Sequence, residues 1–534
     1  MNKSLFKRIL CTIIFALVVY YFALPPINLH AFSFYMYIIF VMLFFIAMSI
    51  PDVVINLFKN KRMIREVKLE NKVIKYMFFS VIGIIPVIIL INIVFSPLFN
   101  SKAYYERIKI NEEGNFTKDI KEVDFSHIPL LDKASSQKLG DRTMGEMTTL
   151  VSQFYVSELY TQINYNDEIV RVTPLEYSGF IKYLTNRKDG IPAYITVNSV
   201  NGKSELKKLD KGMRYAPSAH FFENLQRKLR LSYPTKVFGT ENFEVDNEGN
   251  PYWIIPTIKY TSVGMRRDVD GVVIFNPVDG TSKWYKVEDV PTWVDHVYNS
   301  DLILEQVNDW GAYKHGFLNT IFGQKEVVAT TEGYNYTILN DDVYLYTGIT
   351  SVVADESNIG FILTNMRTKE TTFYEISGAE EFSAMASAEG QVQQMSYNAS
   401  FPLLINFNGK PTYFLSLKDA AGLVKMYAFV DVKDYQKVVV TDSSKGIDVA
   451  ASNYLGDEKV IDKEKLVTKE ITISSIKDVV IDSNTYYYIV DTNNNKYIVS
   501  IKKNRELIPF LSNGDKVTIT YEDSKKVHDI IEIK

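Results

Sequence analysis

The chain has 534 residues, enough for roughly two to four domains once a membrane part is set aside. Lys and Arg number 59 and Asp and Glu number 63, so the charge balance gives no reason to expect nucleic acid as a partner. The single cysteine, Cys11, lies in the first apolar segment, which excludes disulfides and thiol chemistry from the rest of the chain.

Three apolar segments without charged residues occupy the N-terminal part. They are Ile9–Leu24, Ala31–Ile50 and Met77–Leu98. The second and third have about the length that crosses a bilayer, and the first can be extended into the residues before it. We therefore expect a three-helix transmembrane region at 1–99. A cleaved signal peptide is the alternative for the first segment, but no small-residue cleavage site follows it.

Basic residues are distributed unevenly around these segments. Lys3, Lys7 and Arg8 precede the first, and a Lys- and Arg-rich loop joins the second to the third. The short loop between the first two, PPINLH, has no Lys or Arg. The positive-inside rule then places the N-terminus in the cytoplasm and residues 100–534 outside. This predicts a multi-pass cell-membrane protein, with the lipid bilayer as one partner.

One pattern recurs in the extracytoplasmic part. Tyr194–Leu209, Val272–Val287 and Phe361–Ile376 each consist of an apolar-rich strand, a turn and a second strand, which is typical of a β-hairpin. The turn asparagines of the three hairpins are Asn198, Asn276 and Asn365. A helical stretch is expected after each hairpin, and a Gly-x-Pro strand start at Gly190, Gly249 and Gly409. We interpret these as three homologous units; the alternative is hairpin chemistry shared by chance.

The middle unit carries a resemblance to a known family. GNPYWIIPTIKY at 249–260, followed by DGVVIFNPVDGTSKWY at 270–285, is similar to the PepSY-type module of bacterial envelope proteins. The similarity extends over 218–287, with a charged spacer as a departure, and is loose in the other units. It implies a cystatin-like α+β module, a small antiparallel sheet packed on a helix. It also implies a regulatory or inhibitory role outside the membrane, without catalytic residues.

The predicted fold class is a membrane-anchored α+β protein with repeated helix-plus-antiparallel-sheet modules and a small C-terminal β-barrel. The barrel is expected to be OB-like, because about five short strands follow a polar linker. The predicted boundaries are a transmembrane region at 1–99, a stalk or linker at 100–150, a first α+β unit at 151–215, a PepSY-like middle unit at 216–325, a third α+β unit at 326–455, and the barrel at 464–534.

Catalytic and metal-binding motifs are not recognisable in the sequence. His-Glu-x-x-His, Gly-x-Ser-x-Gly and a phosphate loop are missing, and the six histidines lack metal-ligand spacing. We therefore assign no catalytic residue, no cofactor and no metal. Asp268 and Asp270 could form a carboxylate pair, but beside Arg266 and Arg267 solvated ion pairs are the favoured interpretation.

Four tryptophans fall within the middle unit. They are Trp253, Trp284, Trp293 and Trp310. They are candidates for a platform that binds glycan or peptide. The alternative, favoured by the alternation around Trp253 and Trp284, is that they fill the core of one module.

The predicted function is a non-enzymatic, membrane-anchored extracytoplasmic binding or regulatory protein of the bacterial cell envelope. Its partner is expected to be an envelope protein or a wall polymer. The excess of Lys over Arg, with frequent Asn and Ile, is typical of an AT-rich Gram-positive source. Two alternatives stay open: an envelope hydrolase whose site is not visible as a motif, and a structural subunit of a membrane complex.

Overall fold

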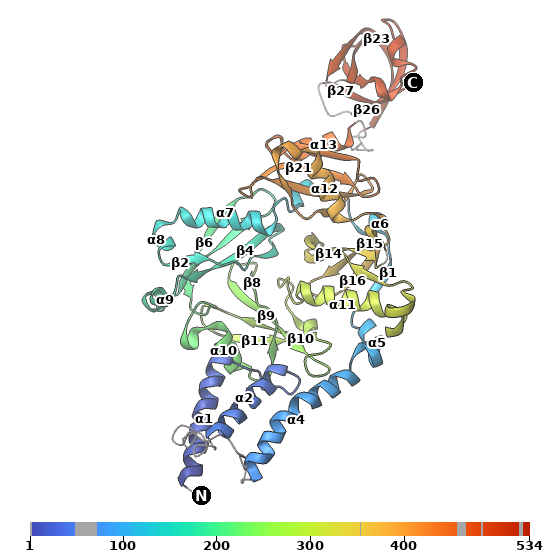
Figure 1. The fold of residues 1–534 in the computed structure, drawn as a ribbon. Helices are drawn as coiled ribbons and strands as arrows, with labels where there is room; N and C mark the ends of the chain where they lie inside the picture. Colours follow the sequence, from blue (N-terminus) through green and yellow to red (C-terminus); the bar gives the residue numbers. More distant parts are fainter. Residues whose placement is uncertain (1–2, 49–71, 353, 457–465, 482–483, 523–526) are drawn as a thin grey trace. The chain divides into compact units, whose positions relative to one another are not determined.

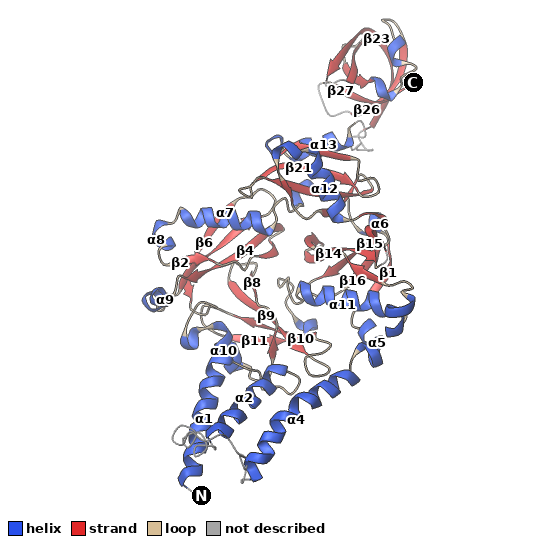
Figure 2. Cartoon of the chain, viewed as in Figure 1, coloured by secondary structure: helices blue, strands red, loops and turns tan. Residues whose placement is uncertain are grey.

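The computed structural model describes residues 3–48, 72–352, 354–456, 466–481, 484–522 and 527–534. The chain forms two compact units, Met1–Lys445 and Gly446–Lys534. Both units contain helices and antiparallel strands (Figure 1, Figure 2), so the predicted mixed α+β class is confirmed.

Three apolar helices begin the first unit: α1 (Lys3–Ala23), α2 (Phe32–Met48) and α4 (Lys72–Val94). By length and composition, α1 and α4 could cross a membrane, whereas α2 has only 17 residues. The described chain therefore supplies two candidate membrane helices where the sequence predicts three. The last two residues of the predicted second segment and most of the basic loop lie outside the described residues.

Within the described part of the first unit, one topology occurs four times. Each copy has a helix, a short strand, a two-strand hairpin and two further antiparallel strands. The short strand and the first hairpin strand both pair with the second hairpin strand. The first copy contains α7 (Lys133–Gly145), β2 (Phe154–Val156), β3 (Thr161–Tyr165), β4 (Glu168–Tyr177), β5 (Ile191–Asn198) and β6 (Ser204–Met213). The second contains α10 (Leu225–Ser232), β7 (Val237–Phe238), β8 (Asn242–Val245), β9 (Pro251–Lys259), β10 (Asp268–Phe275) and β11 (Ser282–Tyr285).

The other two copies follow the same order of elements. The third contains α11 (Ser300–Tyr313), β12 (Val328–Thr330), β13 (Asn335–Leu339), β14 (Asp342–Ser351), β15 (Ala354–Asn365) and β16 (Thr371–Tyr374). The fourth contains α12 (Glu381–Gln391), β18 (Asn398–Ala399), β19 (Leu403–Phe407), β20 (Lys410–Lys418), β21 (Val424–Asp431) and β22 (Val438–Asp442). The third unit predicted from the sequence, 326–455, thus holds the strands of two sheets. The fourth hairpin escaped the pattern because its turn uses Asp431 where the others use asparagine.

The three predicted hairpins share one turn geometry. In each, the asparagine Oδ1 accepts the backbone N–H groups two and three positions on, at 2.8–3.4 Å. The residue four positions on has a positive φ, which is +75° at Gly202, +77° at Gly280 and +66° at Lys369. The predicted equivalence of the three asparagines is therefore confirmed. The Gly-x-Pro match was wrong for Gly190, which precedes β5, whereas Gly249 and Gly409 precede the equivalent strands β9 and β20.

The segment 100–150, which the sequence predicts to be a stalk or linker, contributes to the folded unit. After α5 (Pro97–Tyr105), β1 (Ile110–Gly114) pairs in parallel with β16 and extends the third sheet. Helix α7 packs on β5 and β6 of the first sheet. Strand β1 was not predicted from the sequence because it is largely polar and exposed, and so lacks the alternation that marks a half-buried strand.

Neighbouring sheets share their cores. The first and second sheets enclose one cluster of buried side chains, the second and third sheets a second cluster, and the third and fourth sheets a third. The fourth copy then contacts the start of the first, because Lys418 pairs with Asp132, the N-cap of α7, and Ser135 Oγ of α7 donates to the Gly422 carbonyl at 3.4 Å. The four copies therefore form a closed ring, which can be followed around the centre of Figure 1.

The second unit begins with α13 (Ile447–Leu455) and continues as a closed five-stranded barrel with its own core. The strands are β23 (Leu466–Ile481), β24 (Asn484–Asp491), β25 (Lys496–Ser500), β26 (Lys516–Glu522) and β27 (His528–Ile533). Around the barrel their order is β23-β24-β25-β27-β26. The prediction of a small C-terminal β-barrel is confirmed.

Candidate functional site

The four tryptophans are divided between two cores. Trp253 is 1% exposed, and strand pairing puts it on the same face of the second sheet as the half-buried Trp284. Both contact the core between the first and second sheets, whereas Trp293 and Trp310 contact the core between the second and third. The structure does not bring the four together on one surface, and the burial of Trp253 fits the core interpretation.

Asp268 and Asp270 each have a cationic partner from a distant part of the chain. Asp268 pairs with Lys369 at 3.0 Å, and Asp270 pairs with Lys236 at 2.9 Å. Arg267, the sequence neighbour, instead pairs with Asp301 and Glu305. These contacts fit the ion-pair interpretation, but the partners differ from the adjacent arginines.

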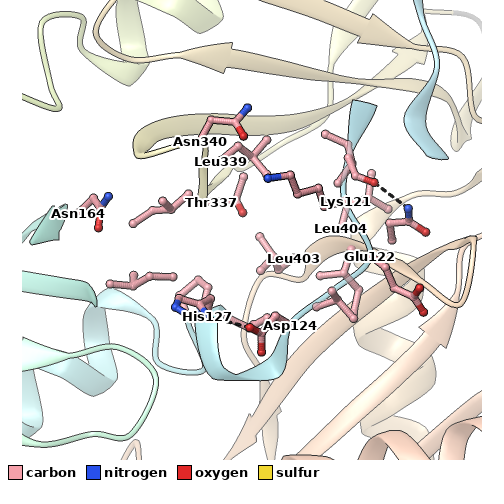
Figure 3. A pocket seen from close by; sticks show the side chains of 18 of the residues that line it. Lys121, Glu122, Asp124, His127, Asn164, Thr337, Leu339, Asn340, Leu403 and Leu404 are labelled. Atoms are coloured by element: carbon pink, nitrogen blue, oxygen red, sulfur yellow. Dashed lines mark hydrogen bonds and ion pairs between the residues drawn. The ribbon is translucent and has the colours of Figure 1, made fainter. Parts of the chain in front are cut away.

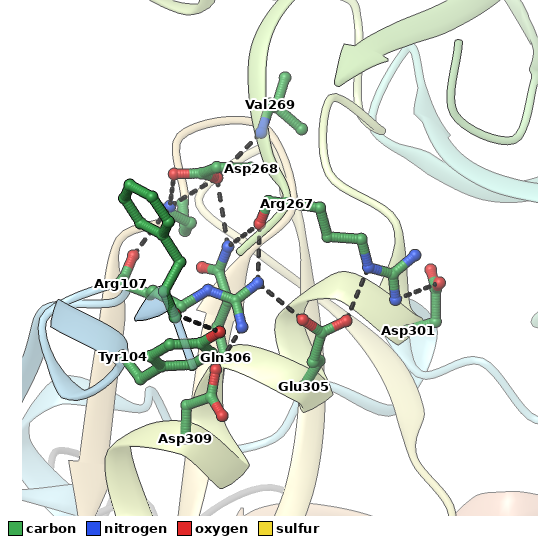
Figure 4. A network of polar contacts seen from close by, with 11 residues as sticks. Tyr104, Arg107, Arg267, Asp268, Val269, Asp301, Glu305, Gln306 and Asp309 are labelled. Atoms are coloured by element: carbon green, nitrogen blue, oxygen red, sulfur yellow. Dashed lines mark hydrogen bonds and ion pairs between the residues drawn. The ribbon is translucent and has the colours of Figure 1, made fainter. Parts of the chain in front are cut away.

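A polar network centred on Arg107 joins the end of helix α5 to the ring (Figure 4). Arg107 pairs with Glu305 at 2.7 Å and with Asp309, and also donates to the Arg267 carbonyl at 2.7 Å. Burial raises the pKa of Asp309 to about 6 although Arg107 opposes the shift. Every charged group in this network has a partner, so we interpret it as structural.

Two cavities lie near the centre of the ring. The first has a volume of about 520 Å³ and is lined by the 119–129 segment and by residues of the first, third and fourth copies (Figure 3). Leu403 and Leu404 form part of its apolar wall, and His127 pairs with Asp124 at 3.0 Å. Lys121 and Glu122 are exposed on its rim. The first cavity can accept a ligand but contains no distinctive buried charge among the described residues.

The second cavity, of about 550 Å³, is lined by side chains from all four copies. They include Arg171 of the first copy, Asn242 of the second, Tyr336 of the third and Phe401 of the fourth. Because each copy contributes to its wall, this cavity exists only when the ring is closed.

Arg171 is the unusual residue of the second cavity. Its side chain is on β4, opposite Gln162 and Val197, and the residue is 5% exposed. Nε is buried without an acceptor, and no hydrogen bond or ion pair joins the guanidinium to another described residue. Burial lowers the pKa of Arg171 to about 10, which still leaves it charged at neutral pH. A buried charge without a partner destabilises the folded state, so a bound anion would stabilise this arrangement.

The carboxylates that line the second cavity already have partners. Asp132 pairs with Lys418, and Asp301 pairs with Arg267 at 2.9 Å. Glu241 accepts a hydrogen bond from Gln226 at 2.8 Å. None of these contacts involves Arg171, although the negative charge of Asp132 favours its cationic form.

Ionisable groups behind the cavity wall are also held close to neutral. Glu244 accepts the backbone N–H groups of Asp295 at 2.8 Å and His296 at 3.0 Å, and burial raises its pKa to about 7. Burial, followed by repulsion from Glu244, raises the pKa of Asp295 well above its usual value. Burial lowers the pKa of His296 to about 4. This wall therefore supplies little fixed negative charge to balance Arg171.

Neither Arg171 nor the second cavity is predicted from the sequence. The available signal was a single cation within the apolar run of β4, EIVRVTPLEY. Such a residue can equally pair with a carboxylate across a sheet, and only the tertiary structure shows that it does not. A scan against protein-family models finds no match to this chain, and a search of curated proteins also finds none. The geometry of the described residues is therefore the basis for assigning a function.

Proposed function

We propose that the chain is a non-enzymatic, membrane-anchored binding protein of the bacterial cell envelope that holds the anionic group of its ligand at Arg171. The observation that carries this proposal is the buried, unpartnered guanidinium in a cavity of about 550 Å³. Arginine suits planar carboxylate and phosphate groups, because its N–H donors form a fixed fork. The volume is that of an ordinary small-molecule site. The ligand is thus a carboxylate- or phosphate-bearing small molecule or the end of a wall polymer.

The binding experiment compares the full-length protein in detergent with Arg171→Met. Glycerol 3-phosphate and glutarate should each raise the unfolding temperature of the wild type, and uncharged glycerol should not. Arg171→Met should lose this response and be at least as stable without ligand, because it removes an uncompensated buried charge. Arg142→Met is the matched control, since Arg142 is exposed on α7. An equal response to both anions in Arg171→Met would exclude this site.

The membrane part of the proposal is a multi-pass topology with three spanning helices, a cytoplasmic N-terminus and residues 100–534 outside. It is supported by the apolar α1 and α4 and by their contacts with the ring. Asn92 of α4 donates to the Val263 carbonyl at 3.0 Å and accepts from Ser262 at 2.8 Å. Reporter fusions after residue 60 should score as cytoplasmic, and fusions after residues 120 and 534 as external. A cytoplasmic score at 534 would contradict this topology.

We also propose a PepSY type for the four α+β copies and an OB type for the barrel. The repeated order of one helix followed by an antiparallel sheet supports a PepSY-type module in all four copies. The closed five-stranded order of the barrel, with β25 and β27 parallel, supports the OB type. The OB fold is a recognised binding scaffold, and the PepSY resemblance implies a regulatory or inhibitory role, which agrees with a function without catalysis.

A further inference from the structure

Exposed apolar side chains gather next to the end of α1. They are contributed by α9 (Phe180–Asn186), the 3₁₀ helix η2 (Phe221–Glu223) and α10. We call them the apolar patch, and its members are Phe180, Ile181, Leu184, Phe221, Phe222 and Leu231. Ile181 is 65% exposed and Phe222 64%. A cluster of this kind marks an interaction site, because single exposed apolar residues are common but contiguous groups are not.

The apolar patch is continuous with the surface of α1. The ring centroid of Phe180 lies 6.0 Å from that of Phe221, and the ring of Phe222 lies 6.1 Å from that of Tyr21 in α1. Figure 1 shows α10 at the end of α1 where that helix meets the ring. If α1 crosses the bilayer, the patch begins at the bilayer surface.

Hydrogen bonds fix the patch relative to α1. Arg227 Nε donates to the Tyr21 carbonyl at 3.3 Å, and its guanidinium lies 4.1 Å from the centroid of the Tyr21 ring. Arg230 Nε donates to the Leu24 carbonyl at 3.0 Å. The last carbonyls of a helix lack partners within the helix, and cations near them are favourable. The two arginines therefore cap α1 and join it rigidly to α10.

The backbone of η2 is held with its aromatic rings outward. Phe221 has a φ of +52°, a costly conformation for a bulky residue that persists only where its surroundings enforce it. The Tyr183 hydroxyl donates to Glu223 at 2.6 Å and lies 3.0 Å from the His220 carbonyl, which can share the same proton. Glu223 also pairs with Arg214 at 2.6 Å. The exposure of Phe221 and Phe222 is thus built into the fold.

Basic residues surround the apolar patch. Lys182, Arg187 and Lys188 belong to α9 or follow it directly, and Lys228 is on α10. Of the nearby carboxylates, Glu223 is buried and pairs with Arg214 and Arg187, Glu241 is half-buried and accepts from Gln226 of α10, and Asp189 is exposed. Apolar side chains flanked by cations are the features that bind the interface of an anionic membrane.

We propose that the apolar patch inserts into the headgroup layer of the membrane surface from which α1 emerges, with the surrounding lysines and arginines contacting anionic lipid phosphates. This inference rests on the membrane anchoring proposed above. A second exposed apolar group, Leu318, Ile321 and Phe322, follows Gly316, which lies near Ser101 of α5. The ring then has apolar contacts beside both α1 and α5, which would hold it close to the bilayer.

The experiment uses the full-length protein with Cys11→Ser, reconstituted in vesicles of phosphatidylcholine and phosphatidylglycerol. Single cysteines are introduced as Ile181→Cys and Phe222→Cys and labelled with an environment-sensitive fluorophore. Leu423→Cys, in the fourth copy and 44% exposed, is the matched control. Val18→Cys in α1 reports anchoring. We expect lipids spin-labelled near the headgroup to quench the labels at 181 and 222 several-fold more than the label at 423.

The outcomes separate the patch from the anchor. Quenching at 18 by lipids spin-labelled deep in the acyl chains, without quenching at 181 and 222, overturns the proposed insertion and leaves the anchoring intact. No quenching at 18 overturns both. Quenching at 181 that is unchanged in vesicles of phosphatidylcholine alone would overturn the role of anionic lipid. A loss of quenching in Lys182→Gln with Lys188→Gln would support that role.

Discussion

At the residue scale, Glu176 makes the stability of the ring depend on pH. It is buried and accepts hydrogen bonds from the Ser218 backbone N–H at 3.0 Å and from the Ser218 hydroxyl. Burial raises the pKa of Glu176 to about 7 from 4.5. The folded state therefore binds more protons than the unfolded state between these values. The stabilisation by the protonated form is complete below pH 4.5 and is lost as pH rises to 7.

Replacement of Glu176 by glutamine should remove this dependence. At pH 8, Glu176→Gln should be more stable than the wild type by up to about 3 kcal/mol, since one pKa unit corresponds to about 1.4 kcal/mol. At pH 4.5 the two proteins should be nearly equal. Thermal unfolding of the full-length protein at both values measures the difference, with the exposed Glu158→Gln as control. A stability difference independent of pH would contradict the assignment.

Two glycines permit a close approach between strands. A Cβ on Gly271 would meet the Tyr285 carbonyl and the ring of Trp284, and a Cβ on Gly360 would meet the Tyr374 carbonyl and the ring of Phe373. The two positions are equivalent in the second and third copies, as their equal spacing to the turn asparagine predicts.

Alanine at either glycine should destabilise the ring by about 1–3 kcal/mol, because the added methyl group would overpack the space between the strands. Gly390→Ala is the matched control. Its Cβ would meet open space within α12, so it should be neutral or stabilising by about 0.5–1 kcal/mol. Apparent unfolding midpoints of the three variants test the contrast. If all three shift alike, the close approach is not the cause.

At the scale of the elements, replacing the turn asparagines should lower the free energy of unfolding by different amounts, in an order that their contacts predict. Each asparagine satisfies two backbone N–H groups, so replacement by alanine should cost about 0.5–2 kcal/mol. Asn365 should cost the most, because it is 2% exposed and its Nδ2 also donates to Asp342 at 2.8 Å. Asn276→Ala should cost less. Asn247→Ala, an exposed residue whose side chain bonds to no other described residue, serves as control in the same melts.

At the scale of the whole molecule, the two units should differ in independence. The C-terminal unit has a closed barrel and its own core, so residues 446–534 expressed alone should be soluble and melt cooperatively. The first copy alone, residues 133–213, should not melt cooperatively, because one face of its sheet packs on the second sheet. Circular dichroism melts of both fragments make the comparison. A cooperative melt of 133–213 would show that the shared core is dispensable.

Local patterns in the sequence determined much of the architecture. Apolar runs located the N-terminal helices, and period-two alternation with turn residues located three hairpins and the barrel strands. The turn asparagines could be matched because a side chain that bonds to its own neighbouring backbone needs no tertiary context. The fourth copy and β1 were not predicted from the sequence. Asp431 replaces the turn asparagine in the fourth copy, and β1 lacks an apolar face.

The candidate site depends on contacts that no local pattern contains. In the sequence, Arg171 is a single cation in an apolar strand. The structure shows that two carboxylates lining its cavity pair with other cations, Asp132 with Lys418 and Asp301 with Arg267. Asp132 and Lys418 are far apart in the sequence and meet because the ring closes between the fourth and first copies, whereas Asp301 and Arg267 meet where the third copy packs on the second. Spacing along the chain determined which elements form, whereas the packing of sheets across the ring decided which charges are paired and left Arg171 without a bonded partner among the described residues.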